Sequence, residues 1–226
     1  MPSCHVVGAI RFIADDGVPL EGEMRRPASV PRAAAVVCHA HPRRGGSKDH
    51  PLLWAIGSDL AARGLAVLSF NFRGTMGSGG RYGGGISEVL DVRAAIARAA
   101  EEVAAVIVVG WSFGASVALN EAVADERPRA LALVGLPLEA PDVEVPSLPD
   151  AAALRSLHQP VLLLCGDRDR FCAPARMAAL GRLIPRASTL VVPEANHFFS
   201  RRERDAAEAI GSFVDRSLSE PETDRN

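Results

Sequence analysis

The sequence lacks several features that would point to particular classes of protein. Its formal net charge of −2 gives no overall reason to expect nucleic acid or an anionic membrane as a partner. It shows no apolar run as long as a membrane span. Its first residues lack a basic segment followed by an apolar stretch, so we expect no signal peptide. Without an internal repeat or an evident linker, the 226 residues suit one α/β domain.

Cysteine is also scarce. The four cysteines, Cys4, Cys38, Cys165 and Cys172, do not have the spacing of a metal site. Cys38 and Cys165 lie within apolar, strand-like runs, so we expect both to pack as small core side chains. This usage fits a reducing cytoplasm better than a disulfide scaffold, and we expect a cytoplasmic protein.

Strand-like and helix-like segments alternate along the chain, which at 48% hydrophobic residues can fill one large core. Strands are expected at 6–14, 20–25, 33–39, 65–70, 103–109, 130–136, 160–165 and 189–192, and helices at 51–63, 88–102, 113–124, 174–183 and 202–218. The first two strands form a predicted hairpin, and the later alternation predicts a mostly parallel sheet with helices on both faces. We expect a single domain over 1–218 and a disordered tail over 219–226.

The connection over 137–159 is short and rich in proline. Enzymes of this architecture often insert a lid domain at this point. Here we expect an irregular loop with a helical turn or two near 150–157. The site at this edge of the sheet should therefore be open, with a minimal lid or none.

The pentapeptide G-W-S-F-G at 110–114 follows an apolar, β-branched run and opens into a segment rich in Ala and Leu. A G-x-S-x-G motif between a strand and a helix is a nucleophile elbow, in which the serine stands at the tip of a sharp turn. The motif alone is a weak signal, because Gly and Ser are common in turns, but its context makes it strong. We therefore predict that Ser112 is a nucleophile.

A nucleophilic serine needs a base, and the base needs a third group to orient it. After a serine in such an elbow, an acid and then a histidine follow in chain order. Asp169, just past a predicted buried strand, is our candidate acid, and Asp167 is its rival. His197, after the last predicted strand, is the candidate base, because His5, His50 and His158 fit the order or the location less well.

An oxyanion hole needs two backbone donors. One should be the N–H of Phe113, the residue after the nucleophile. The other should come from the loop that follows the strand at 33–39. Pro42 has no N–H, so we predict the N–H of His41, with Ala40 as the alternative. His197 already fills the role of base, which argues against a catalytic side chain at His41.

Several motifs together resemble those of the α/β-hydrolase superfamily, and within it a group of small, lidless bacterial serine hydrolases. These motifs are H-A-H-P at 39–42, G-G at 45–46, N-F-R-G-T-M-G-S at 71–78, S-F-G-A at 112–115 and H-F-F at 197–199. The resemblance implies an α/β-hydrolase fold with an eight-stranded, mostly parallel, twisted sheet and hydrolysis of esters, thioesters or amides. In size the chain is similar to dienelactone-hydrolase-like enzymes, from which Ser112 departs because those typically carry cysteine. Arg73 matches an arginine that in relatives supports the loop after the fourth strand, and we interpret it as structural.

Our hypothesis for the reaction is attack of Ser112 on the acyl carbonyl of a small ester, with His197 as base and Asp169 as its orienting partner. No metal or organic cofactor is needed for this chemistry. A thioesterase acting on acyl-CoA or a carrier-bound acyl group, or an acyltransferase, would use the same residues. The fold also serves as a non-catalytic ligand receptor. Candidate substrate-binding residues are Arg43, Arg44, Trp111 and Phe198.

Arginines are frequent in the loops at the carboxyl edge of the predicted sheet. They are Arg43, Arg44, Arg81, Arg168, Arg170, Arg201 and Arg202. One interpretation is that they are solvated and partly neutralised by Asp49, Asp167, Glu194 and Glu203. The alternative is a basic mouth that prefers substrates carrying a carboxylate or a phosphate.

Overall fold

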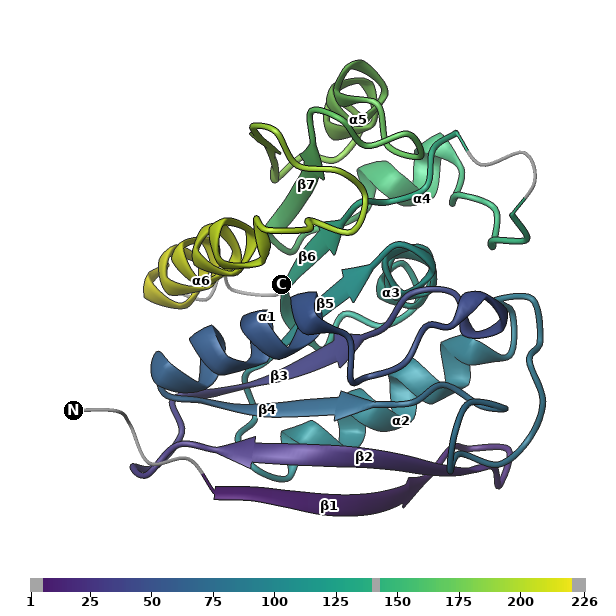
Figure 1. Cartoon of the computed structure of the whole chain (residues 1–226), viewed down its shortest axis with the longest axis vertical. Coiled ribbons are helices and arrows are strands. Elements are labelled where there is room, and N and C mark those ends of the chain that lie inside the picture. Colours follow the sequence, from purple (N-terminus) through teal and green to yellow (C-terminus); the bar gives the residue numbers. More distant parts are fainter. Residues whose placement is uncertain (1–5, 140–142, 221–226) are drawn as a thin grey trace.

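The computed structural model describes residues 6–139 and 143–220. These residues form one twisted, eight-stranded sheet and the helices packed on it (Figure 1). The order of strands is β1-β2-β4-β3-β5-β6-β7-β8. β1 and β2 form an antiparallel hairpin, β2 pairs antiparallel with β4, and all later pairs are parallel. The strands are β1 (Val6–Ile13), β2 (Pro19–Arg26), β3 (Ala33–Cys38), β4 (Leu65–Phe70), β5 (Val106–Trp111), β6 (Pro128–Val134), β7 (Val161–Gly166) and β8 (Ala187–Val192). The predicted mostly parallel, eight-stranded sheet is confirmed.

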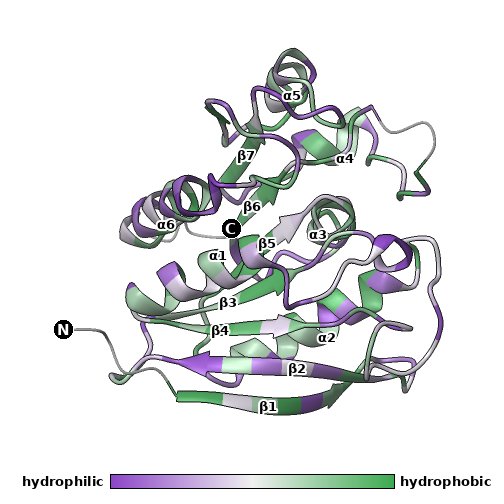
Figure 2. Cartoon of the chain, viewed as in Figure 1, coloured by the Kyte–Doolittle hydropathy of each residue, from purple (hydrophilic) through white to green (hydrophobic). Residues whose placement is uncertain are grey.

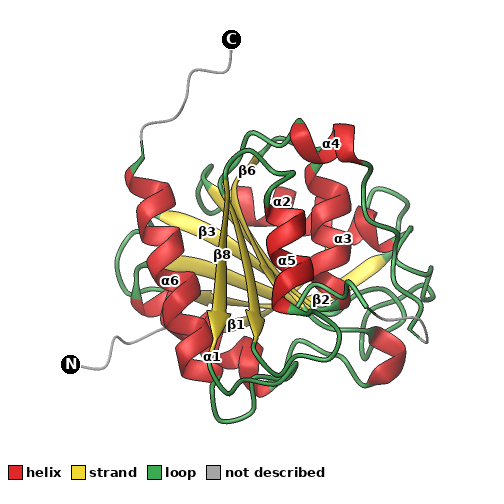
Figure 3. Cartoon of the chain, turned by 90° about the horizontal axis from the view of Figure 1, so that it is seen from above, coloured by secondary structure: helices red, strands yellow, loops and turns green. Residues whose placement is uncertain are grey.

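Helices cover both faces of the sheet, which confirms the predicted fold class (Figure 3). α1 (Pro51–Ala62) and α6 (Glu203–Ser219) lie on one face. α2 (Glu88–Ala100), α3 (Phe113–Ala122) and α5 (Pro174–Gly181) lie on the other. None of the helices in the described part of the chain is both long and apolar enough to cross a membrane.

The central strands are buried on both faces, as parallel strands between two helical layers must be. Every residue of β3, β5 and β7 is buried. Figure 2 shows that the buried strands β6 and β7 are mainly hydrophobic (green), whereas much of β2 is hydrophilic (purple). Cys38 and Cys165 are fully buried in the apolar layer under α2, α3 and α5, as predicted.

Only β4 has its predicted bounds, and the other seven strands differ from theirs by one to three residues at an end. The largest shifts are in β5 and β6, because hydrogen bonding between neighbours sets where a parallel strand ends. β5 continues through Trp111, which pairs with Val134 of β6. β6 then ends, because Gly135 turns away with a φ of 54° and donates its N–H to the carbonyl of Leu164. A short 3₁₀ helix, η1 (Pro42–Arg44), was not predicted.

The connection between β6 and β7 contains one short helix, α4 (Ala151–Arg155), inside the range predicted for a helical turn or two. Residues 140–142 of this connection lie outside the described residues. Of the predicted tail, Ser219 is the last residue of α6, and 221–226 are not described. Residues 1–5, which include Cys4, also lie outside the described residues. The expectation of no signal peptide concerns this segment.

Candidate active site

Ser112 occupies the sharp turn between β5 and α3. Its φ of 56° lies where residues with a side chain are rarely found. The flanking glycines permit the tight turn, because a Cβ built at Gly110 would lie 2.5 Å from the carbonyl oxygen of Gly114. A Cβ at Gly114 would lie 2.5 Å from the carbonyl oxygen of Cys38. The G-x-S-x-G motif therefore has the strained strand–turn–helix setting of a nucleophile elbow.

Ser112, His197 and Asp169 lie in one continuous chain of hydrogen bonds. Ser112 Oγ is 2.9 Å from His197 Nε2, and His197 Nδ1 is 2.9 Å from Asp169 Oδ2 and 3.0 Å from Oδ1. His197 and Asp169 are buried, whereas Ser112 is partly exposed. Because a carboxylate can only accept, Nδ1 of the imidazole donates to Asp169 and Nε2 accepts from the Ser112 hydroxyl. The arrangement can move a proton from the serine to the imidazole.

Asp169, and not its rival Asp167, contacts the imidazole. The Asp169 side chain is fully buried, and its Oδ1 also accepts the N–H groups of Phe171 at 2.8 Å and Cys172 at 3.1 Å. Asp167 is exposed, although it lies only two residues away. The turn after β7 therefore points one carboxylate into the site and the other into solvent.

The loop after β8 holds His197 through its backbone and its ring. Trp111 Nε1 donates to the carbonyl oxygen of His197 at 3.1 Å. The ring of Phe171 packs edge-on against the imidazole, with centroids 4.7 Å apart. Trp111, named from the sequence as a substrate-binding candidate, thus also supports the candidate base.

The loop after β3 faces Ser112 and is organised by the side chain of His41. His41 Nδ1 accepts the N–H of Arg43 at 3.2 Å and so caps η1, and its Nε2 lies 2.9 Å from the carbonyl oxygen of Glu144. Burial lowers the pKa of His41, which favours the neutral ring that this capping bond requires. Within 6–139 and 143–220, the backbone N–H groups of Ala40, His41 and Phe113 have no hydrogen-bond acceptor. The N–H of Phe113 and that of either His41 or Ala40 are therefore available to an oxygen atom beside Ser112.

Tyr82 is a residue of this site that sequence reasoning missed. Its hydroxyl donates to the carbonyl oxygen of Glu144 at 3.0 Å and lies 3.0 Å from His41 Nε2. Burial raises the pKa of Tyr82 to about 12, so the hydroxyl keeps its proton at neutral pH. One hydroxyl thereby joins three loops that are distant in sequence. The only available signal was that Tyr82 is the single tyrosine of the chain.

A pocket of about 270 Å³ opens beside Ser112 and His197. Its walls are mainly apolar and aromatic. They comprise Ala40, His41, Arg44, Trp111, Ser112, Pro137, Val143, Phe171, His197 and Phe198. This volume lies just below the range of about 300–1,000 Å³ typical of drug-sized ligands, so the pocket suits a small group. Three of the four predicted substrate-binding residues line it, while Arg43 lines only an adjoining, more polar pocket.

Comparison with known protein families agrees with this geometry. The model of the α/β-hydrolase domain family matches residues 33–217, which include all of the residues that line the site. The chain belongs to this family. The match extends from β3 into α6, so the β1–β2 hairpin lies outside it.

Relatives of this α/β hydrolase span nearly all of its length. An uncharacterised protein of Rickettsia prowazekii (strain Madrid E) is 26% identical over 204 residues, which are 86% of this chain and 84% of the relative. A lidless α/β serine hydrolase from Xanthomonas campestris is 26% identical, with a TM-score of 0.78 over 96% of this chain and 97% of the other. An α/β serine hydrolase homologue from Coxiella burnetii shares the fold at 24% identity, with a TM-score of 0.79 over 91% and 96% of the two chains. The family and these structures support a hydrolase with the predicted minimal lid.

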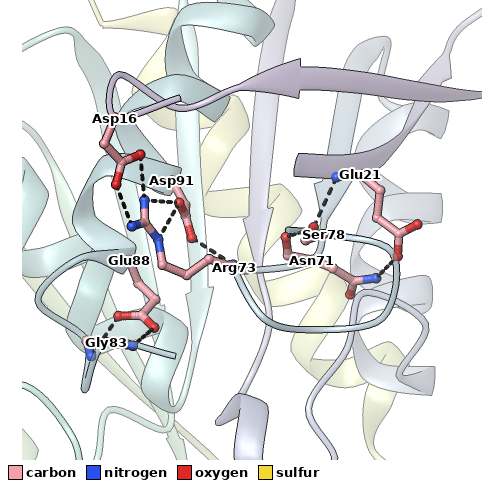
Figure 4. A network of polar contacts seen from close by, with 9 residues as sticks. Asp16, Glu21, Asn71, Arg73, Ser78, Gly83, Glu88 and Asp91 are labelled. Carbon is pink, nitrogen blue, oxygen red and sulfur yellow. Dashed lines mark hydrogen bonds and ion pairs between the residues drawn. The ribbon is translucent and has the colours of Figure 1, made fainter. Parts of the chain in front are cut away.

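Arg73 of this α/β hydrolase lies in a buried network of polar contacts (Figure 4). Its guanidinium donates to Asp91, which is fully buried, and to Asp16 in the turn of the first hairpin. Next to it, Glu88 accepts the N–H groups of Gly83 and Gly85. These contacts fix the loop between β4 and α2, which carries Tyr82. They agree with the structural interpretation of Arg73.

The loop arginines of this α/β hydrolase differ in their surroundings. Arg168 and Arg202 both contact Glu194, and Arg43 lies 3.9 Å from Glu144. Of the seven, only Arg44 lines the pocket beside Ser112, and it lines the adjoining polar pocket as well. The contacts with Glu194 agree with the interpretation that the loop arginines are partly neutralised. The position of Arg44 at the pocket agrees with the alternative, a basic mouth for anionic substrates.

No group of three or more His, Cys, Asp or Glu residues that could hold a metal ion occurs among residues 6–139 and 143–220. The imidazoles and carboxylates of the site contact each other and the backbone.

Proposed function

We propose that this α/β hydrolase cleaves small carboxylic esters through an acyl-enzyme formed on Ser112. The observation that carries the proposal is the chain of contacts from Ser112 Oγ through His197 to Asp169, which opens into an apolar pocket. The volume of the pocket supports a short acyl group. We further propose that residues 1–218 act as one domain.

In the first half of the reaction, His197 Nε2 accepts the hydroxyl proton as Ser112 Oγ attacks the acyl carbonyl. The N–H groups of Phe113 and His41 hydrogen-bond the oxyanion of the tetrahedral intermediate. The bond to the leaving oxygen then breaks, and the imidazolium, stabilised by Asp169, donates its proton to that oxygen. Water next attacks the acyl-enzyme with His197 as base, which releases the acid and restores Ser112.

The direct test is initial rates on p-nitrophenyl acetate, butyrate and octanoate for the wild type and Ser112→Ala. Loss of the nucleophile should lower turnover on the order of 10⁶-fold, as in a serine protease measured in this way. Ser116→Ala is a matched control, because Ser116 lies one turn along α3 and its buried hydroxyl has no hydrogen-bond partner among the described residues. That control should keep wild-type turnover. A pocket of this size should also favour acetate or butyrate over octanoate.

Labelling with a fluorophosphonate separates an enzyme from a non-catalytic receptor. We expect the wild type and Ser116→Ala to be labelled and Ser112→Ala to remain unlabelled, because only an activated serine reacts. Full turnover by Ser112→Ala, or labelling that persists in it, would refute the role of Ser112. Absence of both turnover and labelling in the wild type would favour the receptor.

A thioesterase is the second candidate, supported by the pocket of about 390 Å³ that adjoins the first. Arg43 and Arg44 line it together with His41 and Glu144, so it could receive the phosphates of an acyl-CoA. Initial rates on acetyl-CoA and butyryl-CoA beside the aryl esters decide between the two candidates. A higher kcat/KM for the CoA substrates would favour the thioesterase.

A further inference from the structure

His39 is fully buried beneath the loop that faces Ser112, and both of its ring nitrogens contact backbone groups. Nε2 accepts the N–H of Phe72 at 3.0 Å. A neutral imidazole has one donor and one acceptor nitrogen, so the other nitrogen, Nδ1, must carry the proton. Nδ1 lies 2.6 Å from the carbonyl oxygen of Ala40 and therefore donates to it. Burial lowers the pKa of His39 to about 4, so the ring keeps this form at neutral pH.

The bond to Ala40 determines where the next N–H points. The peptide between Ala40 and His41 is planar and trans, so its C=O and N–H point in opposite directions. Because His39 draws the carbonyl toward the buried ring, the N–H of His41 is directed away from it. Ala40 and His41 both line the pocket that contains Ser112. On the side away from the His39 ring, the N–H of His41 can therefore meet an oxygen atom bound in that pocket.

The preceding peptide points the other way, which separates the two candidate donors. The carbonyl oxygen of His39 would lie 2.6 Å from a Cβ built at Gly114, so it closely approaches the first turn of α3. The N–H of Ala40 belongs to the same peptide and is therefore directed away from that turn. Phe113, whose N–H is the other expected donor, begins α3. The two N–H groups that can converge beside Ser112 are thus those of Phe113 and His41.

We propose that His39 is a positioning residue that directs the His41 N–H into the oxyanion hole through its hydrogen bond to the Ala40 carbonyl. The proposal rests on the proposed function, because it assigns a role in the same acyl transfer. His39 touches no reacting atom. It acts before the reaction, by holding the peptide between Ala40 and His41 in one of its two orientations.

Two substitutions of His39 separate its two hydrogen bonds. The amide nitrogen of Asn corresponds in position to Nδ1, so His39→Asn can still donate to Ala40 but loses the bond from Phe72. The amide of Gln reaches the position of Nε2, so His39→Gln can still accept from Phe72 but loses the bond to Ala40. Each variant removes one buried hydrogen bond, and we expect similar losses of thermal stability from both.

With p-nitrophenyl acetate, His39→Asn should keep kcat within about 3-fold of the wild type. His39→Gln should lower kcat by about 10- to 100-fold with KM unchanged, somewhat less than the roughly 10²- to 10³-fold loss caused by deleting an oxyanion donor. Equal losses of kcat in the two variants, or a loss confined to KM, would overturn the proposal. Rates of the wild type and Ser112→Ala test the proposed function separately. If the wild type has no turnover that depends on Ser112, the proposed function and this role both fail.

A measurement on the wild type tests the same proposal without any substitution. Nitrogen-15 NMR should show that the proton of the His39 ring is on Nδ1. A short alkyl trifluoromethyl ketone forms a hemiketal with Ser112 Oγ, and its oxyanion should shift the amide proton resonances of His41 and Phe113 downfield. A proton on Nε2 of His39, or a shift at Ala40 in place of His41, would overturn the proposal.

Discussion

Gly135 lies directly against His197. A Cβ built at Gly135 would be 3.2 Å from His197 Nδ1 and Cε1, and 3.2 Å from Asp169 Oδ2. The end of β6 therefore passes so close to the pair of imidazole and carboxylate that a methyl group would press on both. Gly135 also has a φ of 54°, a conformation that side chains disfavour.

Gly135→Ala should lower kcat by about 10- to 100-fold, because the imidazole and carboxylate must shift by a few tenths of an ångström, and a displacement of about 1 Å can cost about 100-fold. Thermal stability should fall as well, since an Ala at positive φ is strained. Rates on p-nitrophenyl acetate and thermal unfolding are the measurements. Gly8→Ala is the control, because a Cβ at Gly8 would meet no atom of the described residues within 4 Å, and it should leave kcat unchanged. Wild-type kcat in a folded Gly135→Ala protein would contradict the expected displacement.

Tyr82→Phe should lower kcat by about 3- to 10-fold and the free energy of unfolding by about 1 kcal/mol. The substitution removes the hydroxyl that binds the Glu144 carbonyl and touches His41, while His41 keeps its own 2.9 Å contact with that carbonyl. A typical hydrogen bond contributes about 1 kcal/mol, which sets the scale of the effect. Kinetics with p-nitrophenyl acetate and urea unfolding measure both quantities. An unchanged kcat would mean that the contact of His41 with Glu144 is sufficient to hold the loop.

Arg73→Met should destabilise the fold by about 3–5 kcal/mol, because it leaves the buried carboxylate of Asp91 without its partner. Arg176→Met is the matched control, since the ion pair between Arg176 and Glu139 is exposed and should contribute less than about 1 kcal/mol. Urea unfolding at pH 7 measures both losses. Similar losses in the two variants would show that the Arg73 network does not stabilise the fold more than a surface ion pair does.

Stability should fall as the pH decreases from about 6.5 to 4, in part because of His39. Burial lowers the pKa of His39 from 6.5 to about 4, so in this window the unfolded chain binds a proton that the folded protein does not. Protonation therefore favours unfolding, and the contribution of His39, about 3 kcal/mol, is present above pH 6.5 and lost toward pH 4. Urea unfolding from pH 7 to 4.5 should show a shallower pH dependence for His39→Asn than for the wild type. Equal slopes would exclude His39 as the source.

Salt should distinguish the two interpretations of the loop arginines. If Arg44 draws anionic substrates into the pocket, kcat/KM for an ester with a free carboxylate should fall with added NaCl, while that for p-nitrophenyl acetate should not. The anionic preference should also weaken in Arg44→Gln. Arg170→Gln is the control, because Arg170 is exposed and does not line the pocket. The same salt response for both esters would favour solvated arginines.

The fold was largely predictable because its signals are local in sequence. An apolar run, a G-x-S-x-G turn and a segment rich in Ala and Leu predict β5, Ser112 and α3 from neighbouring residues alone. The alternation of such units then limits the sheet to a mostly parallel one. The exact ends of the strands could not be predicted from neighbouring residues, because Trp111 belongs to β5 through its pairing with Val134.

The candidate site was predictable only in part. Chain order indicated Ser112, an acid and His197, yet Asp167 and Asp169 remained rivals until the turn after β7 showed which one faces the imidazole. Tyr82 and Gly135 carry no motif, because each acts through residues far away in sequence. The contacts of the buried His39 ring with the Ala40 carbonyl and with the N–H of Phe72, at the end of another strand, carry no sequence signal either.

The sequence by itself determined the class of fold, the position of the elbow and the order of the residues proposed for the chemistry. These follow from hydrophobic periodicity and from short motifs, which act over a few residues. The tertiary structure alone decided which carboxylate meets His197, how close Gly135 lies to that pair and which carbonyl the buried His39 ring contacts. The physical reason is that hydrogen bonds and close contacts act over 3 Å in space, between groups that the chain brings together only when the whole sheet has formed.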